Sequence, residues 1–393
     1  MVDKLRIGYL YDFEAYPTKG GNHRHAYELT QGFLMKGHNV SVIDDPTMPG
    51  VTNFNGMEVS NKRFIDNIDV LYIRIDARST REWKILSPCM EMAKSKSIPI
   101  VWEINAPANE SLAYSWLSGK TSTTAQAKES TVRRLRRWFH AARKIPSIYL
   151  EERHRKLLAK NVSAAICVSS ALKEYAVEGL GIKNSIALPN GGPIISEKEI
   201  EKRSRRKIRQ NFTVVYSGSA IYPWQGLDYL SATISLANNL APDIIFVLAV
   251  NQRSQILPST GNVIILEGLD RDEMLDEICC AGACVSIHPE YPWSKYNFHN
   301  SPMKLFEYMA CKAPSISSNH GQMKDLINHG EDGLLCENNP IDILDKIIYL
   351  RDNPVKARSI GSKGWERIQS ELNWDNNVTE SLKCFDQVRS VKD

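Results

Sequence analysis

Short runs of hydrophobic residues alternate with amphipathic stretches along most of the chain. A short continuous apolar run is typical of a strand that is buried on both faces of a parallel sheet. Apolar residues three or four positions apart instead predict a helix. In the first half, this pattern predicts strands over residues 5–10, 39–44, 69–74, 99–105 and 163–170, and helices over 22–36, 80–96 and from 171 onward.

The same alternation starts again after a charge-dense linker at 197–209. Two successive series of strand–helix units are typical of two doubly wound α/β domains. We therefore expect two Rossmann-like domains, over residues 1–195 and 196–374, with a cleft between them. The second series predicts strands over 213–217, 243–250, 262–266, 283–287 and 315–317, and helices over 227–238 and 271–280.

Composition places the chain among soluble proteins. Its 393 residues suffice for two domains, and its hydrophobic and charged contents, 42% and 24%, are those of a globular protein. The sequence shows no signal-peptide pattern and no membrane-spanning run. We therefore expect a cytoplasmic protein, or one on the cytosolic face of a membrane. The eight cysteines lack CxxC spacing, which favours free thiols over disulfides or a zinc site.

The net charge of +4 is small but unevenly distributed. Segment 133–156 mixes basic residues with apolar ones such as Trp138, Phe139 and Tyr149. Such a helix could lie on an anionic membrane, where each basic residue contributes about 1 kcal/mol. A solvated basic surface fits the pattern at least as well, and no nucleic-acid-binding motif accompanies it. The basic residues are Arg133, Arg134, Arg136, Arg137, Arg143, Lys144, Arg153, Arg155 and Lys156.

The stretch from Ser301 to Pro314 carries the most distinctive candidate chemistry. Ser301 can cap a helix and Pro302 suits its first turn, while Pro314 would end it. The N-terminal N–H groups and the dipole of this helix favour a phosphate. Lys304 adds positive charge, and Glu307 could accept hydrogen bonds from ribose hydroxyls. An amphipathic helix with a solvated Lys–Glu pair would give the same pattern.

Two features of the first half point to the same kind of site. Gly20 and Gly21 directly precede a predicted helix, where glycine lets backbone N–H groups approach a phosphate. Many such loops need glycine only for the turn, however. Glu103 and Asn105 lie at the carboxyl end of a predicted strand, the edge at which ligands of open α/β sheets usually bind.

Several motifs, in this order, resemble those of the retaining glycosyltransferases of family 4, which have the two-domain GT-B fold. The resemblance covers nearly the whole chain, and its most specific motif is the stretch 301–314. In the first domain it rests on GGNHRHAYEL at 20–29, WEINAP at 102–107, CVSSAL at 167–172 and LPNGG at 188–192. In the second domain it also rests on YSGS at 216–219, WQG at 224–226 and EGL at 267–269.

The resemblance implies an enzyme that moves a hexosyl group from a UDP- or GDP-linked sugar to an acceptor hydroxyl, with retention of configuration. It implies a polysaccharide or glycolipid product. It implies neither a cofactor nor a metal ion, because helix dipoles and basic side chains stabilise the departing diphosphate. It also implies that a C-terminal helix over 375–393 crosses back onto the first domain, anchored by Trp374.

The resemblance assigns roles to individual residues as well. The catalytic candidates are Lys304, Glu307 and His288, and His288 is expected to face the sugar. The acceptor-side candidates are His25, Glu103 and Asn105, although His25 could equally be a surface residue and Glu103 could satisfy only a loop backbone. The donor-binding candidates are Gly20, Gly21, Gly218, Ser219, Gln225, Gly268, Leu269, Ser301, Pro302, Lys304 and Glu307.

The sequence departs from the family pattern at three positions. The first of two glutamates eight positions apart would fall at position 299, where this chain has His299. The phosphate-binding arginine and lysine of the Gly218 loop are replaced by Ser219 and Gln225. We expect Lys304 to supply the missing positive charge.

Two other functions fit parts of this pattern. A nucleotide-sugar epimerase shares the two-domain architecture, but it would need a set of catalytic acids that we do not find. A non-catalytic partner subunit could bind a nucleotide sugar or a membrane and transfer nothing. Donor hydrolysis by the purified protein would distinguish the transferase from the partner subunit.

Overall fold

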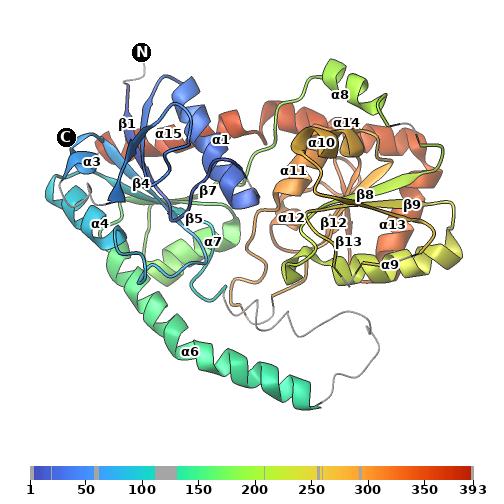
Figure 1. The fold of residues 1–393 in the computed structure, drawn as a ribbon, viewed down its shortest axis with the longest axis horizontal. Coiled ribbons are helices and arrows are strands. Elements are labelled where there is room, and N and C mark those ends of the chain that lie inside the picture. The colour runs from blue at the N-terminus through green and yellow to red at the C-terminus, as the bar shows by residue number, and fades with distance from the viewer. Residues whose placement is uncertain are drawn as a thin grey trace.

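Two parallel sheets lie side by side, and helices pack around each of them (Figure 1). The computed structural model describes residues 4–18, 20–56, 62–110, 131–207, 209–254, 257–258, 260–291 and 294–390. Both halves are doubly wound α/β domains, as the alternation of strands and helices predicts. In the described ranges, no helix is both long and apolar enough to cross a membrane.

The described part of the first domain has a seven-stranded sheet in the order β3-β2-β1-β4-β5-β6-β7. The order of the chain reverses between β1 and β4, which makes this the switch point of the sheet. The strands are β1 (Arg6–Leu10), β2 (Asn39–Ile43), β3 (Thr52–Phe54), β4 (Val70–Ile75), β5 (Ile100–Ile104), β6 (Ala164–Cys167) and β7 (Ser185–Ala187). The helices are α1 (Gly21–Met35), α3 (Arg63–Asp66), α4 (Leu86–Ser95), α6 (Thr131–Ala159), α7 (Ser170–Glu174) and the π-helix η1 (Tyr175–Leu180).

The described part of the second domain has a six-stranded sheet in the order β10-β9-β8-β11-β12-β13, with its switch point between β8 and β11. The strands are β8 (Thr213–Gly218), β9 (Ile245–Val250), β10 (Val263–Glu267), β11 (Ala283–Ser286), β12 (Ser315–Ser318) and β13 (Leu334–Cys336). The helices are α8 (Glu197–Ser204), the 3-10 helix η2 (Pro223–Gln225), α9 (Leu227–Leu240), α10 (Arg271–Cys279), α11 (Met303–Ala310), α12 (Gly321–Leu326), α13 (Pro340–Asp352) and α14 (Pro354–Ser370). The described chain ends with α15 (Trp374–Ser390).

The strands are apolar because helices bury both of their faces. All six residues of β4 are buried. On β1, Ile7 and Tyr9 belong to a core that also contains residues of α1 and α15. Leu10 belongs to a separate core that includes residues of α3 and α4. Burial on both faces explains the continuous apolar runs by which the sequence predicts these strands.

The last helix, α15, crosses back onto the first domain, as the resemblance implies. In Figure 1 this red helix lies among the blue elements of the amino-terminal domain. Trp374, Val378 and Phe385 are buried in the core of the first domain. A Cβ at Gly32 of α1 would overlap the side chain of Val378, so the close approach of the two helices requires glycine there.

The structure corrects two expectations about the first domain. The helix expected over 80–96 begins only at Leu86, because Thr80 instead donates its backbone N–H and its hydroxyl to Glu151 of α6 (2.9 and 2.6 Å). Arg155 is not part of a basic surface. It is fully buried, and its guanidinium donates to the carbonyl oxygens of Asp76 and Ala106 (2.7 and 2.9 Å). Arg155 therefore ties α6 to the loops after β4 and β5.

Candidate functional site

The loops at the carboxyl ends of the two sheets meet at residues 297–302, a segment that we call the junction loop. Ser169, two residues after the end of β6, donates to the backbone oxygen of His299 (2.7 Å). Asn190, after β7, donates its backbone N–H to Ser301 Oγ (3.0 Å) and its side-chain amide to the backbone oxygen of Ser301 (2.8 Å). Both domains therefore present to each other the edges at which α/β sheets bind ligands.

Ser301 does not cap α11, contrary to expectation. The cap position belongs to Pro302, and no side chain caps the helix. Ser301 Oγ is instead engaged by the backbone N–H of Asn190 from the other domain. The helix also ends at Ala310, and Lys312 adopts a left-handed conformation (φ 57°) before Pro314 is reached.

Lys304, in the first turn of α11, extends toward the loop that follows β8. Its Nζ donates to Gln225 Oε1 (2.6 Å) and lies 4.0 Å from the centroid of the Tyr216 ring. Gly218 has no side chain, and a Cβ at this position would lie only 2.9 Å from Nζ, so the loop backbone packs closely against the lysine. Burial lowers the pKa of Lys304 to about 7, although the charge of Glu307 opposes the shift. Lys304 thus brings a buried amine to the loop that carries Ser219 and Gln225, the positions at which the resemblance would place basic residues.

Glu307 lies among charged residues from both domains. Its side chain is 15% exposed, and its Oε1 is 3.9 Å from Arg271 of α10. Arg271 is also 3.9 Å from Glu28 of α1, and Glu28 pairs with Arg24 one turn earlier. Burial raises the pKa of Glu307, while the charges of Arg271 and Arg24 oppose the rise. These four residues join α1 of the first domain to α10 and α11 of the second.

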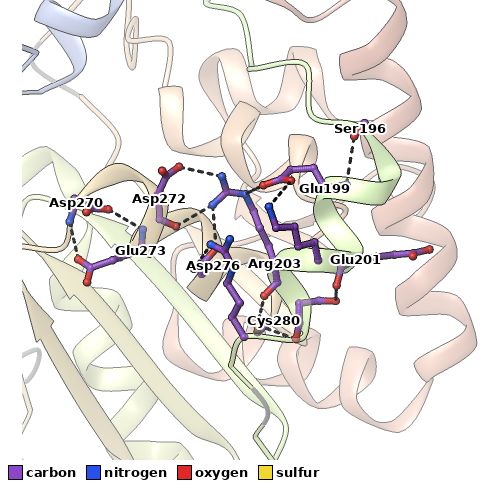
Figure 2. Close-up of polar contacts among 12 residues, drawn as sticks. Ser196, Glu199, Glu201, Arg203, Asp270, Asp272, Glu273, Asp276 and Cys280 are labelled. Carbon is purple, nitrogen blue, oxygen red and sulfur yellow. Dashed lines mark hydrogen bonds and ion pairs between the residues drawn. The ribbon is translucent and has the colours of Figure 1, made fainter.

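The start of α10, which carries Arg271, is held by polar contacts (Figure 2). Asp270 and Glu273 form a capping box, which satisfies two N–H groups at the helix start. Arg203 of α8 pairs with Asp272 and with Asp276 (both 2.9 Å). The charge-dense segment after the first domain therefore fixes the helix that supplies Arg271.

Glu103, at the end of β5, is the centre of a buried cluster in the first domain. Its side chain is 1% exposed, and it accepts hydrogen bonds from Tyr9 (2.6 Å), Arg74 and Asn105. His25 Nε2 lies 2.8 Å from the same carboxylate. Burial alone would raise the pKa of Glu103, but the charges of His25 and Arg74, together with hydrogen bonds from His25 and Tyr9, lower it well below its ordinary value. Both proposed alternatives, a surface His25 and a Glu103 that binds only loop backbone, are wrong.

His288 is buried and uses both ring nitrogens within the protein. Nδ1 lies 2.8 Å from the backbone oxygen of Trp224, and Nε2 lies 3.1 Å from Ser286 Oγ. Burial lowers the pKa of His288 to about 3, and the charge of Lys304 adds to the shift. A sugar contact through a ring nitrogen would have to break one of these hydrogen bonds. The expected role of His288 at the sugar stays a prediction.

His299, at the position of the family's first glutamate, is fully buried and contacts a carboxylate from the other domain. Its Nε2 lies 3.3 Å from Glu110 Oε1, and its Nδ1 lies 3.2 Å from the backbone oxygen of Asn297. The structure therefore places an acidic group beside the residue that departs from the family pattern.

The structure shows what the candidate glycines face and which backbone conformations they adopt. A Cβ at Gly21 would be 3.5 Å from Met303 Sδ, so the start of α1 faces the start of α11. Gly218 and Gly268 have positive φ angles of 145° and 67°, which favour glycine. Of the other donor-binding candidates, Gly20 is exposed, Leu269 is half-buried, and Ser219 accepts a hydrogen bond from Tyr216 through its backbone oxygen (3.0 Å).

Sequence reasoning missed Arg74, Asn190 and Arg271. Arg74 is the one charged residue in the apolar strand β4, and a buried charge near the carboxyl end of a strand is a usable signal. Arg271 directly follows a helix-capping aspartate after β10, which also places it at the ligand-binding edge. Asn190 gave no comparable signal, because its partners lie more than a hundred residues away. In the described part of the chain, no group of three or more His, Cys, Asp or Glu side chains is arranged to hold a metal ion.

Comparisons with known proteins agree with this geometry. Residues 235–383 match a family described as glycosyl transferase-like. An uncharacterized glycosyltransferase of Methanocaldococcus jannaschii is 23% identical over 239 residues, which cover 59% of this chain and 60% of that protein. The chain thus matches less than two thirds of the length of this relative.

Solved structures share the whole fold. HepE of Anabaena, solved in complex with UDP and glucose, superimposes with a TM-score of 0.65 at 14% identity, over 96% of this chain and 99% of that one. A glycosyltransferase from Rickettsia africae gives a TM-score of 0.67 at 13% identity, over 98% and 99% of the two chains. At these identities the likeness shows the fold, which is the two-domain GT-B arrangement.

The buried Lys304 should make stability depend on pH in a defined window. Below pH 7, Nζ is protonated in both the folded and the unfolded chain. Between the folded pKa of about 7 and the ordinary value of 10.5, the unfolded chain holds a proton that the folded protein lacks. We compare the free energy of unfolding of the wild type with that of Lys304→Met. The wild-type value minus the variant value should therefore increase with pH above 7, by up to about 1.4 kcal/mol per pH unit.

Urea denaturation of both proteins between about pH 6 and pH 9 measures this difference. Lys198→Met, which removes an exposed lysine of α8, is the control and should give a flat difference. A flat difference for Lys304→Met as well would show that Lys304 keeps an ordinary pKa in the folded protein.

Proposed function

We propose that this protein is a glycosyltransferase that moves a sugar from a nucleotide-diphosphate sugar to an acceptor hydroxyl. The observation that carries the proposal is the arrangement of α11, on which Lys304 and Glu307 lie one turn apart at the junction of the two domains. The family match over 235–383 and the shared fold of HepE, solved with UDP and glucose, support it.

The proposed donor site follows the direction of α11. The diphosphate lies at the start of the helix, between Gly21 and Lys304, where free N–H groups and the helix dipole favour an anion. The ribose lies one turn further on, with its hydroxyls donating to Glu307. We place the nucleobase beside Gly268 and Leu269, which the family resemblance names as donor-binding candidates. A UDP-linked donor is the first candidate to test, and a GDP-linked donor is the second.

Lys304 is the proposed source of catalytic charge. Departure of the sugar leaves about one additional negative charge on the diphosphate, which a positioned cation stabilises. A buried ammonium is effective here because little water screens it. We further propose retention of configuration, by attack of the acceptor on the same face from which the diphosphate leaves. In such a reaction the protein acts mainly by holding geometry and charge.

The acceptor is proposed to approach from the first domain, near Asn105 and the cluster around Glu103. Glu103 already accepts several hydrogen bonds and is buried. Its role is therefore to fix Arg74, His25 and Asn105, and it does not serve as an exposed base. We also propose that the product of the reaction is a polysaccharide or a glycolipid.

We also propose that α6 lies against an anionic membrane, where a lipid-linked acceptor would be presented. In Figure 1, α6 extends away from the first domain. Its described side chains include exposed apolar residues and three exposed basic residues, Arg143, Arg153 and Lys156. That combination suits the boundary between lipid headgroups and acyl chains. The exposed apolar residues are Phe139 (59%), Ile145 (57%), Tyr149 (67%), Leu150 (44%) and Leu157 (52%).

Glu307→Ala should weaken UDP binding by roughly 30- to 150-fold. The reason is that ribose hydroxyls bonded to a buried carboxylate contribute about 2–3 kcal/mol. Calorimetric titration with UDP measures the affinity, and Glu366→Ala, which removes an exposed carboxylate of α14, is the matched control. An unchanged affinity in a folded Glu307→Ala protein would overturn the ribose assignment.

Liposome flotation tests the membrane proposal. The protein should float with vesicles that contain phosphatidylglycerol, less with neutral vesicles, and less at high salt, because salt screens the charges. Replacing Tyr149 and Leu150 together by serine should reduce flotation. Ile341→Ser, at an apolar residue of α13 that is 65% exposed, should not. Equal flotation on neutral and anionic vesicles, or an unaffected double variant, would contradict the proposal.

A further inference from the structure

A continuous chain of polar contacts runs from the acceptor-side carboxylate to the start of α11. Glu103 Oε1 lies 2.8 Å from His25 Nε2. His25 Nδ1 lies 2.6 Å from Asn190 Oδ1. The amide nitrogen of Asn190 donates to the backbone oxygen of Ser301 (2.8 Å), and Ser301 immediately precedes the cap residue of α11. The chain therefore links β5 of the first domain to the helix that carries Lys304 and Glu307.

The hydrogen-bond partners of Asn190 fix the direction of two of these contacts. The Asn190 amide nitrogen must face the Ser301 carbonyl oxygen, because the reverse orientation would bring two acceptor oxygens together. Asn190 Oδ1 therefore faces His25 Nδ1, which must donate. Nε2 lies 2.8 Å from the Glu103 carboxylate, a close polar contact that is not aligned as a hydrogen bond.

The chain is closed to water along its length. His25 is 3% exposed, Asn190 7% and Ser301 8%. The His25 ring makes a T-shaped contact with Trp374 of α15, with ring centroids 5.2 Å apart. The segment before Asn190 is held by Asn377 of the same helix, whose side-chain amide donates to the backbone oxygen of Pro189 (2.6 Å). Water therefore cannot easily replace a lost link, and buried polar groups left without partners cost free energy.

We propose that His25 is a positioning residue that acts through Asn190 to hold the start of α11, and thereby couples the acceptor side of the protein to the donor site. The inference rests on the proposed function for the identity of α11 as the donor helix. Within the described residues, the hydrogen-bonded route from His25 to α11 runs through Asn190 and Ser301. Helix α1, which carries His25, also faces α11 directly at Gly21. A loss of affinity in a His25 variant is therefore assigned to the chain only where Asn190→Ala gives the same loss and the two losses are not additive.

His25→Phe tests the inference, because phenylalanine retains a ring against Trp374 but offers no hydrogen-bonding atoms. We expect it to weaken UDP binding by about tenfold, the loss expected for one buried link of about 1.4 kcal/mol. Asn190→Ala should give a similar loss. The double variant should lose no more than either single variant, because both substitutions break the same chain.

The control is His38→Phe, which replaces a second buried histidine whose Nδ1 accepts from the backbone N–H of Leu5 (3.1 Å), away from the junction loop. It should lower stability without changing UDP affinity. His25→Gln keeps a hydrogen-bonding amide and covers the case in which His25→Phe does not fold. It should recover part of the lost affinity. An unchanged affinity in His25→Phe, or additive losses in the double variant, would overturn the inference.

Amide hydrogen exchange in the absence of nucleotide separates this inference from the proposed function. His25→Phe and Asn190→Ala should accelerate exchange in the first turn of α11, and His38→Phe should not. If the wild type binds no UDP, GDP or ADP while the exchange effect is present, the proposed function fails and the positioning role stands. If exchange in α11 is unchanged in both variants, the positioning role itself is refuted.

Discussion

A lysine that is buried without a carboxylate partner at bonding distance is the constraint around which the second domain is built. Within the described residues, Lys304 Nζ has the neutral amide of Gln225 and the face of the Tyr216 ring as its close contacts. Neither contact offsets the cost of taking an ammonium out of water, and the pKa of about 7 reflects that deficit. We propose that a bound diphosphate offsets this cost.

The first domain has the opposite arrangement of charge, with a buried carboxylate and several partners around it. There the buried carboxylate of Glu103 is surrounded by Arg74, His25, Tyr9 and Asn105. The two clusters come within reach of each other because each lies near the carboxyl end of a parallel sheet and because α15 crosses from one domain to the other. The junction loop then joins them through Asn190 and Ser301. Each domain contributes one of the two clusters, and the fold brings the clusters together.

Most of the secondary structure could be predicted from the sequence, because strands buried on both faces leave continuous apolar runs and their connecting helices leave a periodic stripe. The long strands β4, β5 and β9 and the crossing helix α15 follow from local pattern or from the fold it implies. The short strands β3, β7 and β13 do not, because three residues carry too little pattern. The late start of α4 could not be predicted either, since it depends on Glu151, more than seventy residues away.

The sequence predicts the arrangement of the candidate site only where the residues are close together in the chain. Lys304 and Glu307 stand on one helix with a distinctive sequence, so their proximity follows from helical spacing. The contacts of Ser301 and Arg271 cross between the domains, and His25 contacts residues of its own domain that lie far along the chain. The neighbouring sequence does not encode these partners. Arg155 shows the opposite error: it belongs to a basic run, yet it is fully buried against the loops after β4 and β5. Tertiary packing decides which charged side chains stay in contact with water.

Proton uptake on nucleotide binding is the most direct measurement of the central claim that Lys304 meets the diphosphate. At pH 8 the phosphates of UDP are fully ionised, whereas most Lys304 side chains with a pKa of about 7 are neutral. A bound diphosphate favours the charged amine, so binding should take up roughly 0.9 proton per UDP. Calorimetry in buffers of different ionisation enthalpy measures this number. We predict uptake close to one proton in the wild type and none in Lys304→Met. Binding of UDP to the wild type without proton uptake, or equal uptake in Lys304→Met, would contradict the account.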